Sequence, residues 1–371
     1  MSMRIALMTE YFPKTEKAEL SGGVEARTFY IGKYLAKRHD VTVFTTPEGG
    51  FEGDSRVLGM TVRRIGPPVE YSQSSSLLSR ARFIRNAIKE VGKESYDVAD
   101  GASFVSYPVA WNSRAEKKVA TYHDVWVGEW VRHLGLKGLL GEALERYALS
   151  RRWDGFIAVS EYTKGKLVEA GVSRDKIAVV HNGVEYEKLE RITADKFREP
   201  TVCIVSRLVS YKNVDDLVRA LPHVKKKIPE VKLKIVGGGP EEGNLRRLAV
   251  KLGLEGNVEF MGFVKDHDKV LETIKSSHAF ALPSTVEGFG ISIIEAMALK
   301  VPYVASDIPA IREATHGGAG GLLHKPRDTE DLAGKLIKAL EGKVKANADF
   351  IQKEYDWKTL AKKIEETYEN A

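Results

Sequence analysis

Short apolar segments rich in β-branched residues alternate with amphipathic helical segments along this chain, and this alternation constrains the fold most. In the first half the strand candidates are 5–8, 41–45, 62–65, 119–121, 157–159 and 178–180, and the helix candidates are 24–38, 77–92, 138–151 and 161–171. Strands that alternate with helices of this length indicate parallel sheets covered by helices. The first half is therefore predicted to be an α/β domain.

The same alternation restarts after a polar stretch at 192–200, which is typical of a linker. Beyond it the strand candidates are 202–206, 232–236, 258–260, 279–282 and 303–305, and the helix candidates are 214–227, 241–252, 268–275 and 291–299. A chain of 371 residues suits two domains of ordinary size. We predict two Rossmann-like α/β domains, over 1–192 and 200–354, and a last helix over 355–371.

Composition narrows the class of protein. The chain is 43% hydrophobic and 29% charged, as expected of a globular protein, and its single cysteine, Cys203, excludes an intramolecular disulfide and most zinc sites. Cys203 lies in an apolar strand candidate and is expected in the core. No segment resembles a signal peptide or a spanning helix, which predicts a cytoplasmic protein. The net charge of +6 suits phosphates and membrane surfaces equally, and no nucleic-acid partner is predicted.

Glutamine is scarce in this chain. Only Gln73 and Gln352 are present, beside abundant lysine and glutamate. That bias is typical of heat-adapted proteins and predicts a thermophilic source, with an archaeon among the options.

Residues 282–297 carry the densest chemical signal. They read as the end of a buried strand, a glycine loop opened by Glu287, and a helix that carries Glu295. Backbone N–H groups at the start of a helix favour an anion such as a phosphate. The groups concerned are near Gly288, Phe289, Gly290 and Ile291. The segment therefore suits a phosphorylated sugar, with one acid beside the sugar and the other further along the ligand.

The two acids, with seven residues between them, resemble the E-x7-E motif of the retaining, nucleotide-sugar-dependent glycosyltransferases of family 4. The resemblance covers nearly all of the chain. It implies the GT-B fold, in which two Rossmann-like domains with parallel sheets face a cleft. The first domain would take the acceptor, the second would bind the donor, and the last helix would pack back on the first domain.

Two basic residues follow the first strand of the second half. Arg207 and Lys212 would lie at the carboxyl end of that strand, where α/β folds bind ligands. Taken alone they fit a solvated turn, but they match the family's Arg and Lys that contact the donor diphosphate. The family often has glycine where this chain has Asn213, and asparagine also tolerates left-handed backbone angles.

The resemblance assigns further donor contacts in the second half. Gly237 and Gly239 match a Gly-x-Gly turn that approaches the donor, although a tight turn alone would also explain them. Phe263 and Val264 match the segment that lies along the nucleobase.

In the first half, the resemblance singles out a glycine pair and a histidine. Gly22 and Gly23 open a helix and match the family's glycines near the donor phosphate. His123 follows an apolar strand and matches a histidine that contacts the transferred sugar, whereas a lone histidine is more often structural. Ser160 and Asn182 match family positions beside the cleft.

The resemblance implies a catalytic set and no metal. Glu287 would orient the sugar hydroxyls, Glu295 would bind the ribose, and His123, Arg207 and Lys212 would complete the catalysis. Asp-x-Asp occurs at 266–268, a form that another transferase fold uses for metal binding, but the first aspartate is expected to cap a helix. No metal and no cofactor are predicted.

The predicted activity is retaining transfer of a hexosyl unit from a UDP-, GDP- or ADP-linked sugar to a hydroxyl of a carbohydrate or lipid acceptor. Two alternatives remain: a GT-B-like sugar-nucleotide epimerase, and a non-catalytic protein that binds nucleotide sugars or carbohydrates. The basic helix 77–92 fits an ordinary surface helix, which we favour, or peripheral contact with an anionic membrane.

Overall fold

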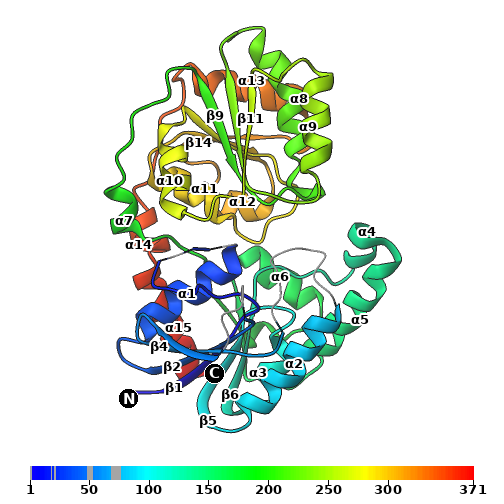
Figure 1. Cartoon of the computed structure of the whole chain (residues 1–371), viewed down its shortest axis with the longest axis vertical. Helices are drawn as coiled ribbons and strands as arrows, with labels where there is room; N and C mark the ends of the chain where they lie inside the picture. The colour runs from blue at the N-terminus through cyan, green and yellow to red at the C-terminus, as the bar shows by residue number, and fades with distance from the viewer. Residues whose placement is uncertain (1, 18, 21, 48–52, 68–76) are drawn as a thin grey trace. The chain divides into compact units, whose positions relative to one another are not determined.

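The computed structural model describes residues 2–17, 19–20, 22–47, 53–67 and 77–371 (Figure 1). The chain divides into two compact units, one formed by residues 1–182 and 357–371 and the other by residues 183–356. We call them unit 1 and unit 2. The chain first passes from unit 1 to unit 2 between residues 182 and 183, which is before the polar stretch 192–200 that the sequence predicts as a linker. The short helix α7 (Tyr186–Glu190) therefore belongs to unit 2.

Unit 1 contains an eight-stranded sheet in the order β3-β4-β2-β1-β5-β6-β7-β8. The strands are β1 (Arg4–Met8), β2 (Asp40–Thr45), β3 (Gly53–Val57), β4 (Met60–Arg64), β5 (Ser95–Gly101), β6 (Arg114–Tyr122), β7 (Gly155–Ala158) and β8 (Ile177–Val179). The pairs are parallel, as predicted, except β3 with β4 at one edge, which are antiparallel. A short Leu58-Gly59 turn joins these two strands, and a tight hairpin makes neighbouring strands antiparallel.

The helices of unit 1 cover both faces of this sheet. They are α1 (Gly23–Leu35), α2 (Leu77–Val91), α3 (Tyr107–Trp111), α4 (Trp130–Leu134), α5 (Gly138–Leu149), α6 (Glu161–Glu169) and α15 (Trp357–Asn370). Ile5 and Leu7 of β1 join one apolar cluster, whereas Ala6 and Met8 join another on the opposite face. Successive side chains of a strand point to opposite faces, so a strand buried on both sides reads as a continuous apolar run.

The last helix, α15, packs within unit 1 against α1 (Figure 1). Trp357 at its start stacks on Tyr30 of α1 with 5.8 Å between ring centroids. At its other end Tyr368 donates a hydrogen bond of 2.6 Å to Asp100 of β5. The Lys117 ammonium donates to the carbonyls of Tyr368 (2.9 Å) and Glu369 (2.7 Å), which are among those that a helix end leaves without partners.

Unit 2 contains a six-stranded parallel sheet in the order β11-β10-β9-β12-β13-β14. The strands are β9 (Thr201–Val205), β10 (Lys232–Val236), β11 (Val258–Gly262), β12 (Ala279–Leu282), β13 (Tyr303–Ser306) and β14 (Gly321–His324). The remaining helices are α8 (Val214–Lys225), α9 (Glu242–Lys251), α10 (His267–Ser276), α11 (Ile291–Ala298), α12 (Pro309–Ala314), α13 (Thr329–Leu340) and α14 (Ile351–Tyr355). Cys203 is fully buried in β9, as predicted.

Two expectations about membranes can be compared with this fold. The helix α2 buries Phe83, Ala87 and Val91, which is the inward packing that the sequence favours for this segment. In the described ranges, no helix is long and apolar enough to cross a lipid bilayer.

Candidate active site

Two predicted residues of unit 2 meet at the carboxyl edge of its sheet. Strands β9 and β12 are parallel neighbours, so the loops that leave them emerge at the same edge. Lys212 lies in the loop after β9, and Glu287 lies in the loop after β12. The Lys212 Nζ is 2.6 Å from the Glu287 Oε1, with only 13% and 9% of the two side chains exposed. Each charge is therefore compensated by the other in a place that holds little water.

Asn213 ties these two loops together. Its backbone is left-handed (φ 47°), and its amide nitrogen donates to the carbonyl of Pro283 (3.2 Å) and the hydroxyl of Thr285 (3.0 Å) in the loop after β12. Its amide oxygen accepts a 2.8 Å hydrogen bond from Arg327, which also lies 3.0 Å from Asp216. The family's glycine would adopt this backbone conformation but make none of these contacts. Asn213 thus holds the loop of Lys212 against the loop of Glu287.

Arg207 lies at the beginning of the same β9–α8 loop. Its side chain is exposed, and its Nη2 donates a 2.7 Å hydrogen bond to the hydroxyl of Tyr211. Both predicted diphosphate contacts are therefore placed on one loop, one of them exposed and the other largely buried.

Glu295 has a partner that the sequence motifs do not reveal. It lies on α11, and its Oε1 is 3.0 Å from the Nε2 of His267, the first residue of α10. Burial opposes the charged imidazole, but the carboxylate of Glu295 outweighs burial, so the pKa of His267 is raised above its usual value. The pair brings together the helix after β11 and the helix after β12.

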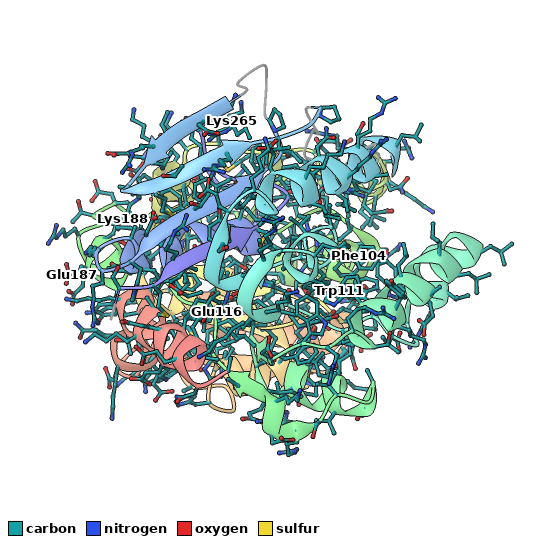
Figure 2. All side chains as sticks on the ribbon, turned by 90° about the horizontal axis from the view of Figure 1, so that it is seen from below. Phe104, Trp111, Glu116, Glu187, Lys188 and Lys265 are labelled. Carbon is teal, nitrogen blue, oxygen red and sulfur yellow. The ribbon has the colours of Figure 1, made fainter. Side chains whose placement is uncertain are left out.

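The two aspartates beside His267 serve other contacts. The Asp266 carboxylate accepts a 3.1 Å hydrogen bond from the backbone N–H of Asp268 and caps α10, as predicted. Asp268 forms an ion pair with Lys188 of α7, whose position is labelled in Figure 2. In the described part of the chain, no group of three or more His, Cys, Asp or Glu side chains is arranged to hold a metal ion.

The N-terminus of α11 follows the loop predicted to bind an anion. Gly290 precedes the helix with a left-handed backbone (φ 91°), and no side chain caps the helix there. Phe289 turns its ring into the core, where it meets Tyr355 edge-on at 5.1 Å. The predicted contacts of Gly288, Phe289, Gly290 and Ile291 concern their backbone and stay predictions.

The glycine turn after β10 requires its glycines for close packing. A Cβ on Gly237 would lie 1.9 Å from the carbonyl oxygen of Ser206, and one on Gly239 would lie 2.4 Å from that of Leu208. The turn thus lies directly against the β9–α8 loop. The predicted nucleobase segment lies close to this turn, because a Cβ on Gly238 would be 3.8 Å from the Cβ of Phe263. Phe263 is 48% exposed and Val264 is half-buried. These contacts explain the glycines structurally, and the proposed donor contacts stay predictions.

Unit 1 has a polar cluster of its own at the carboxyl edge of its sheet. His123 follows β6, and its Nε2 is buried without a hydrogen-bond partner among the described residues. Burial, and then the positive charge of Arg27, lowers the pKa of His123 to about 3, so the imidazole is neutral at physiological pH. Arg27 donates to the carbonyl of His181 (2.7 Å) and to the side chain of Asn182 (3.0 Å).

Asp100 belongs to the same cluster and is not predicted from the sequence. It accepts hydrogen bonds from Tyr368 (2.6 Å) and Thr121 (2.9 Å). Its burial raises the pKa of the carboxyl group, against the effect of these bonds and of Arg27. A polar residue at a buried position of a strand has no apolar signal, and only its contacts in the fold identify it.

Two other predicted positions in unit 1 immediately precede helices. Gly22 has an extended backbone (φ −175°) and precedes α1, which starts at Gly23, so the local conformation does not require glycine at Gly22. The adjoining Ser21 lies outside the described residues. Ser160 caps α6 by accepting a 2.9 Å hydrogen bond from the backbone of Thr163. The roles expected of Gly22, Gly23 and Ser160 toward a donor stay predictions.

Comparison with known families covers almost the whole chain. Residues 21–188 match the family described as Glycosyltransferase Family 4, and residues 186–357 match Glycosyl transferases group 1. The chain belongs to the family 4-like glycosyltransferases of the GT-B fold.

This glycosyltransferase has curated relatives of similar length. It is 27% identical over 398 residues to the GDP-mannose-dependent alpha-(1-6)-phosphatidylinositol monomannoside mannosyltransferase of Mycobacterium tuberculosis, with 97% of each chain covered. It is 24% identical over 392 residues to an uncharacterized glycosyltransferase of Methanocaldococcus jannaschii, which covers 100% of this chain and 98% of the relative.

Solved structures share the fold of this glycosyltransferase. Anabaena HepE, crystallised with UDP and glucose, superimposes with a TM-score of 0.77 at 20% identity and covers 100% of both chains. Sucrose-phosphate synthase of Thermosynechococcus elongatus gives a TM-score of 0.77 at 21% identity, with 99% and 98% covered. At these identities the likeness establishes the GT-B fold and nothing finer.

Replacing Asn213 by alanine should lower the free energy of unfolding by about 2–3 kcal/mol, because it loses the hydrogen bonds and strains a left-handed backbone. Asn213→Gly keeps the left-handed backbone without strain, so it should lower the free energy of unfolding by only about 1–2 kcal/mol. Denaturant titration of both variants measures the difference. An Asn213→Ala variant as stable as the natural protein would show that the tie between the loops contributes nothing.

The His267–Glu295 pair should make stability depend on pH. Because the pKa of His267 is raised in the folded protein, the stabilisation is complete below the usual value of 6.5 and is lost as the pH rises through the raised pKa. Glu295→Gln should therefore lower the free energy of unfolding by on the order of 1 kcal/mol near pH 6, and by less near pH 9. Denaturant titrations at the two pH values test this.

A matched control exists in the same unit. His316 and Glu354 are also 3.0 Å apart, but their side chains are 41% and 39% exposed. Water screens such a pair, so Glu354→Gln should change stability little at either pH. Equal losses of stability in the two variants would contradict a stabilising His267–Glu295 pair. A loss of stability in Glu295→Gln that grows with pH would contradict it as well.

Proposed function

We propose that this glycosyltransferase transfers a hexosyl unit from a nucleotide-diphosphate sugar to an acceptor hydroxyl, with retention of configuration and without a metal ion. The observation that carries the proposal is the contact of 2.6 Å between Lys212 and Glu287, which places a cation and an acid from two neighbouring strand ends together. In α/β folds ligands bind at this edge of the sheet. A diphosphate needs the cation, and sugar hydroxyls need the acid.

We assign the roles in the proposed reaction as follows. Lys212 and the exposed Arg207 stabilise the charge that develops on the departing diphosphate, and this is the largest demand of the transfer. Glu287 orients the sugar hydroxyls, and Glu295 accepts hydrogen bonds from the ribose. His123 contacts the transferred sugar as a neutral imidazole, which accepts or donates one hydrogen bond without adding charge.

Retention of configuration is what the family resemblance implies, and the state of the acids chooses between its two routes, a covalent intermediate or same-face attack. Glu287 is bound to Lys212 and Glu295 to His267, so neither is placed as a free carboxylate nucleophile. We therefore propose attack on the face of the sugar that the diphosphate leaves. The bond from C1 to the diphosphate oxygen breaks as the acceptor oxygen bonds to C1, and the hydroxyl proton passes to the leaving diphosphate.

The donor base and the acceptor are open within this proposal. The name of the mycobacterial relative specifies GDP-mannose and a phosphatidylinositol mannoside, whereas the Anabaena structure holds UDP and glucose. UDP- and GDP-linked sugars are therefore candidates, ADP-linked sugars stay a candidate from the sequence prediction, and the acceptor is a carbohydrate or a lipid.

Replacing Lys212 or Glu295 by alanine should lower the rate of transfer at least about 100-fold, because charge-assisted contacts in a partly buried site are lost. The measurement is product formation from each donor class over an acceptor panel, with the anomeric configuration of the product read by NMR. Lys251→Ala and Glu255→Ala are matched controls, since both side chains are exposed on unit 2. Folding of every variant is checked by its thermal midpoint.

Several results would contradict this proposal. Near-normal rates in both site variants would contradict the assignment of the site. A product with inverted anomeric configuration would contradict the retaining mechanism. Loss of transfer when a chelator removes metal ions would contradict the proposal that no metal ion is needed. A changed sugar without any acceptor would favour an epimerase, and donor binding without turnover would favour a binding protein.

A further inference from the structure

Tyr211 contacts both cations of the proposed diphosphate site. It lies in the short 3-10 turn Ser210–Lys212 of the β9–α8 loop, and its side chain is half-buried. It follows Arg207 by four residues and immediately precedes Lys212. The Arg207 guanidinium and the Lys212 ammonium both lie against its side chain. None of the sequence motifs assigns a function to this tyrosine.

The hydroxyl of Tyr211 orients the guanidinium of Arg207. The Nη2 of Arg207 donates a hydrogen bond of 2.7 Å to this hydroxyl, although the arginine side chain is exposed. A long exposed side chain otherwise samples many rotamers, and ordering it on a ligand costs free energy. A hydrogen bond within the loop removes part of that cost before a ligand binds.

This hydrogen bond does not cancel the charge that it orients. A phenol hydroxyl is a neutral acceptor, whereas the partner of Lys212 is the carboxylate of Glu287, which compensates the charge of the ammonium. A diphosphate is bound most strongly by charge-assisted hydrogen bonds, and the planar guanidinium of an arginine matches its oxygens in pairs. The hydroxyl of Tyr211 therefore orients a cation without itself compensating the positive charge.

The backbone of Tyr211 is anchored to the loop that carries Glu287. Its carbonyl accepts a hydrogen bond of 2.9 Å from the backbone N–H of Thr285 in the loop after β12, and the Thr285 hydroxyl lies 3.3 Å from the same oxygen. The next residue, Lys212, contacts Glu287 of that loop. Tyr211 is therefore fixed to the loop after β12, and its hydroxyl extends this fixed position to Arg207.

The ring of Tyr211 lies near the second cation. The Lys212 Nζ is 5.7 Å from the centroid of this ring, within the range at which an aromatic face attracts a cation. One neutral side chain thus contacts Arg207 at its hydroxyl and Lys212 at its ring. Because the two contacts use different parts of the tyrosine, a phenylalanine at this position separates them.

We propose that Tyr211 is a positioning residue of the donor site, whose hydroxyl holds the Arg207 guanidinium in the orientation that binds the donor diphosphate. Tyr211 acts through Arg207, and the guanidinium is the group that contacts the diphosphate. The inference rests on the proposed function, in which Arg207 and Lys212 bind that diphosphate.

Calorimetric titration with UDP, GDP and ADP tests this on the full-length protein, in a cycle of Tyr211→Phe, Arg207→Ala and the double variant. Tyr211→Phe keeps the ring beside Lys212 and removes only the hydroxyl. The dissociation constant of the nucleoside diphosphate that binds best should therefore rise about fivefold to tenfold. On top of Arg207→Ala the same substitution should change it less than about twofold, because the group that the hydroxyl orients is gone.

Tyr303→Phe is a matched control in the same unit. Tyr303 begins β13, at the edge of the sheet opposite the carboxyl ends, and its hydroxyl donates a hydrogen bond of 3.0 Å to the carbonyl of Ala319. This variant also loses one tyrosine hydroxyl, but far along the strand from the site, so it should bind nucleoside diphosphates like the natural protein. Thermal midpoints verify that every variant is folded.

Two results would overturn the inference and leave the proposed function standing. One is a Tyr211→Phe variant that binds nucleoside diphosphates as tightly as the natural protein. The other is an equal loss of affinity with and without Arg207, which would indicate a general structural role. Unchanged binding in Arg207→Ala, or no binding of any nucleoside diphosphate, would instead overturn the proposed diphosphate site and this inference with it.

Discussion

The contact between Lys212 and Glu287 is the interaction on which the candidate donor site depends. It joins the loops that leave β9 and β12, two neighbouring strands of one parallel sheet. An isolated charge in so little solvent would be strongly destabilising, so each partner keeps the other in place. Asn213 fixes the same two loops through hydrogen bonds of 3.2 and 3.0 Å. The proposed diphosphate would therefore meet a cation that is already oriented, and preorganised charge is what stabilises a departing anion.

The second acid of the motif is held by an independent contact. Glu295 is paired with His267, which begins the helix after β11, while Glu287 is paired across β9 and β12. The two acids therefore have separate supports at one edge of the sheet. In unit 1, the neutral His123 lies near the buried Arg27, and Asp100 connects the same region to Tyr368 of the last helix. The helix α15 therefore contributes a hydrogen bond to the polar cluster in addition to apolar packing.

Much of this arrangement is predictable from the sequence because it depends on local patterns. The apolar runs of β1, β9 and β12 and the amphipathic helices give the two α/β units, and the spacing of Glu287 and Glu295 indicates the family. The strand β5 escapes prediction because its acids interrupt the apolar pattern, although Asp100 is buried through hydrogen bonds. His267 escapes because its partner is distant in sequence. Asn213 is predicted only to tolerate a left-handed backbone, since side-chain bonds between loops leave no periodic signal.

The central claim is that unit 2 binds a nucleotide-diphosphate sugar through Lys212, Glu287 and Glu295. Calorimetric titration of the protein with a panel of UDP-, GDP- and ADP-linked sugars tests it most directly, with Glu295→Ala as the comparison. The account predicts binding of one nucleotide class at a dissociation constant on the order of micromolar, lost in the variant. Absence of binding to every donor, or equal binding by the variant, would contradict it.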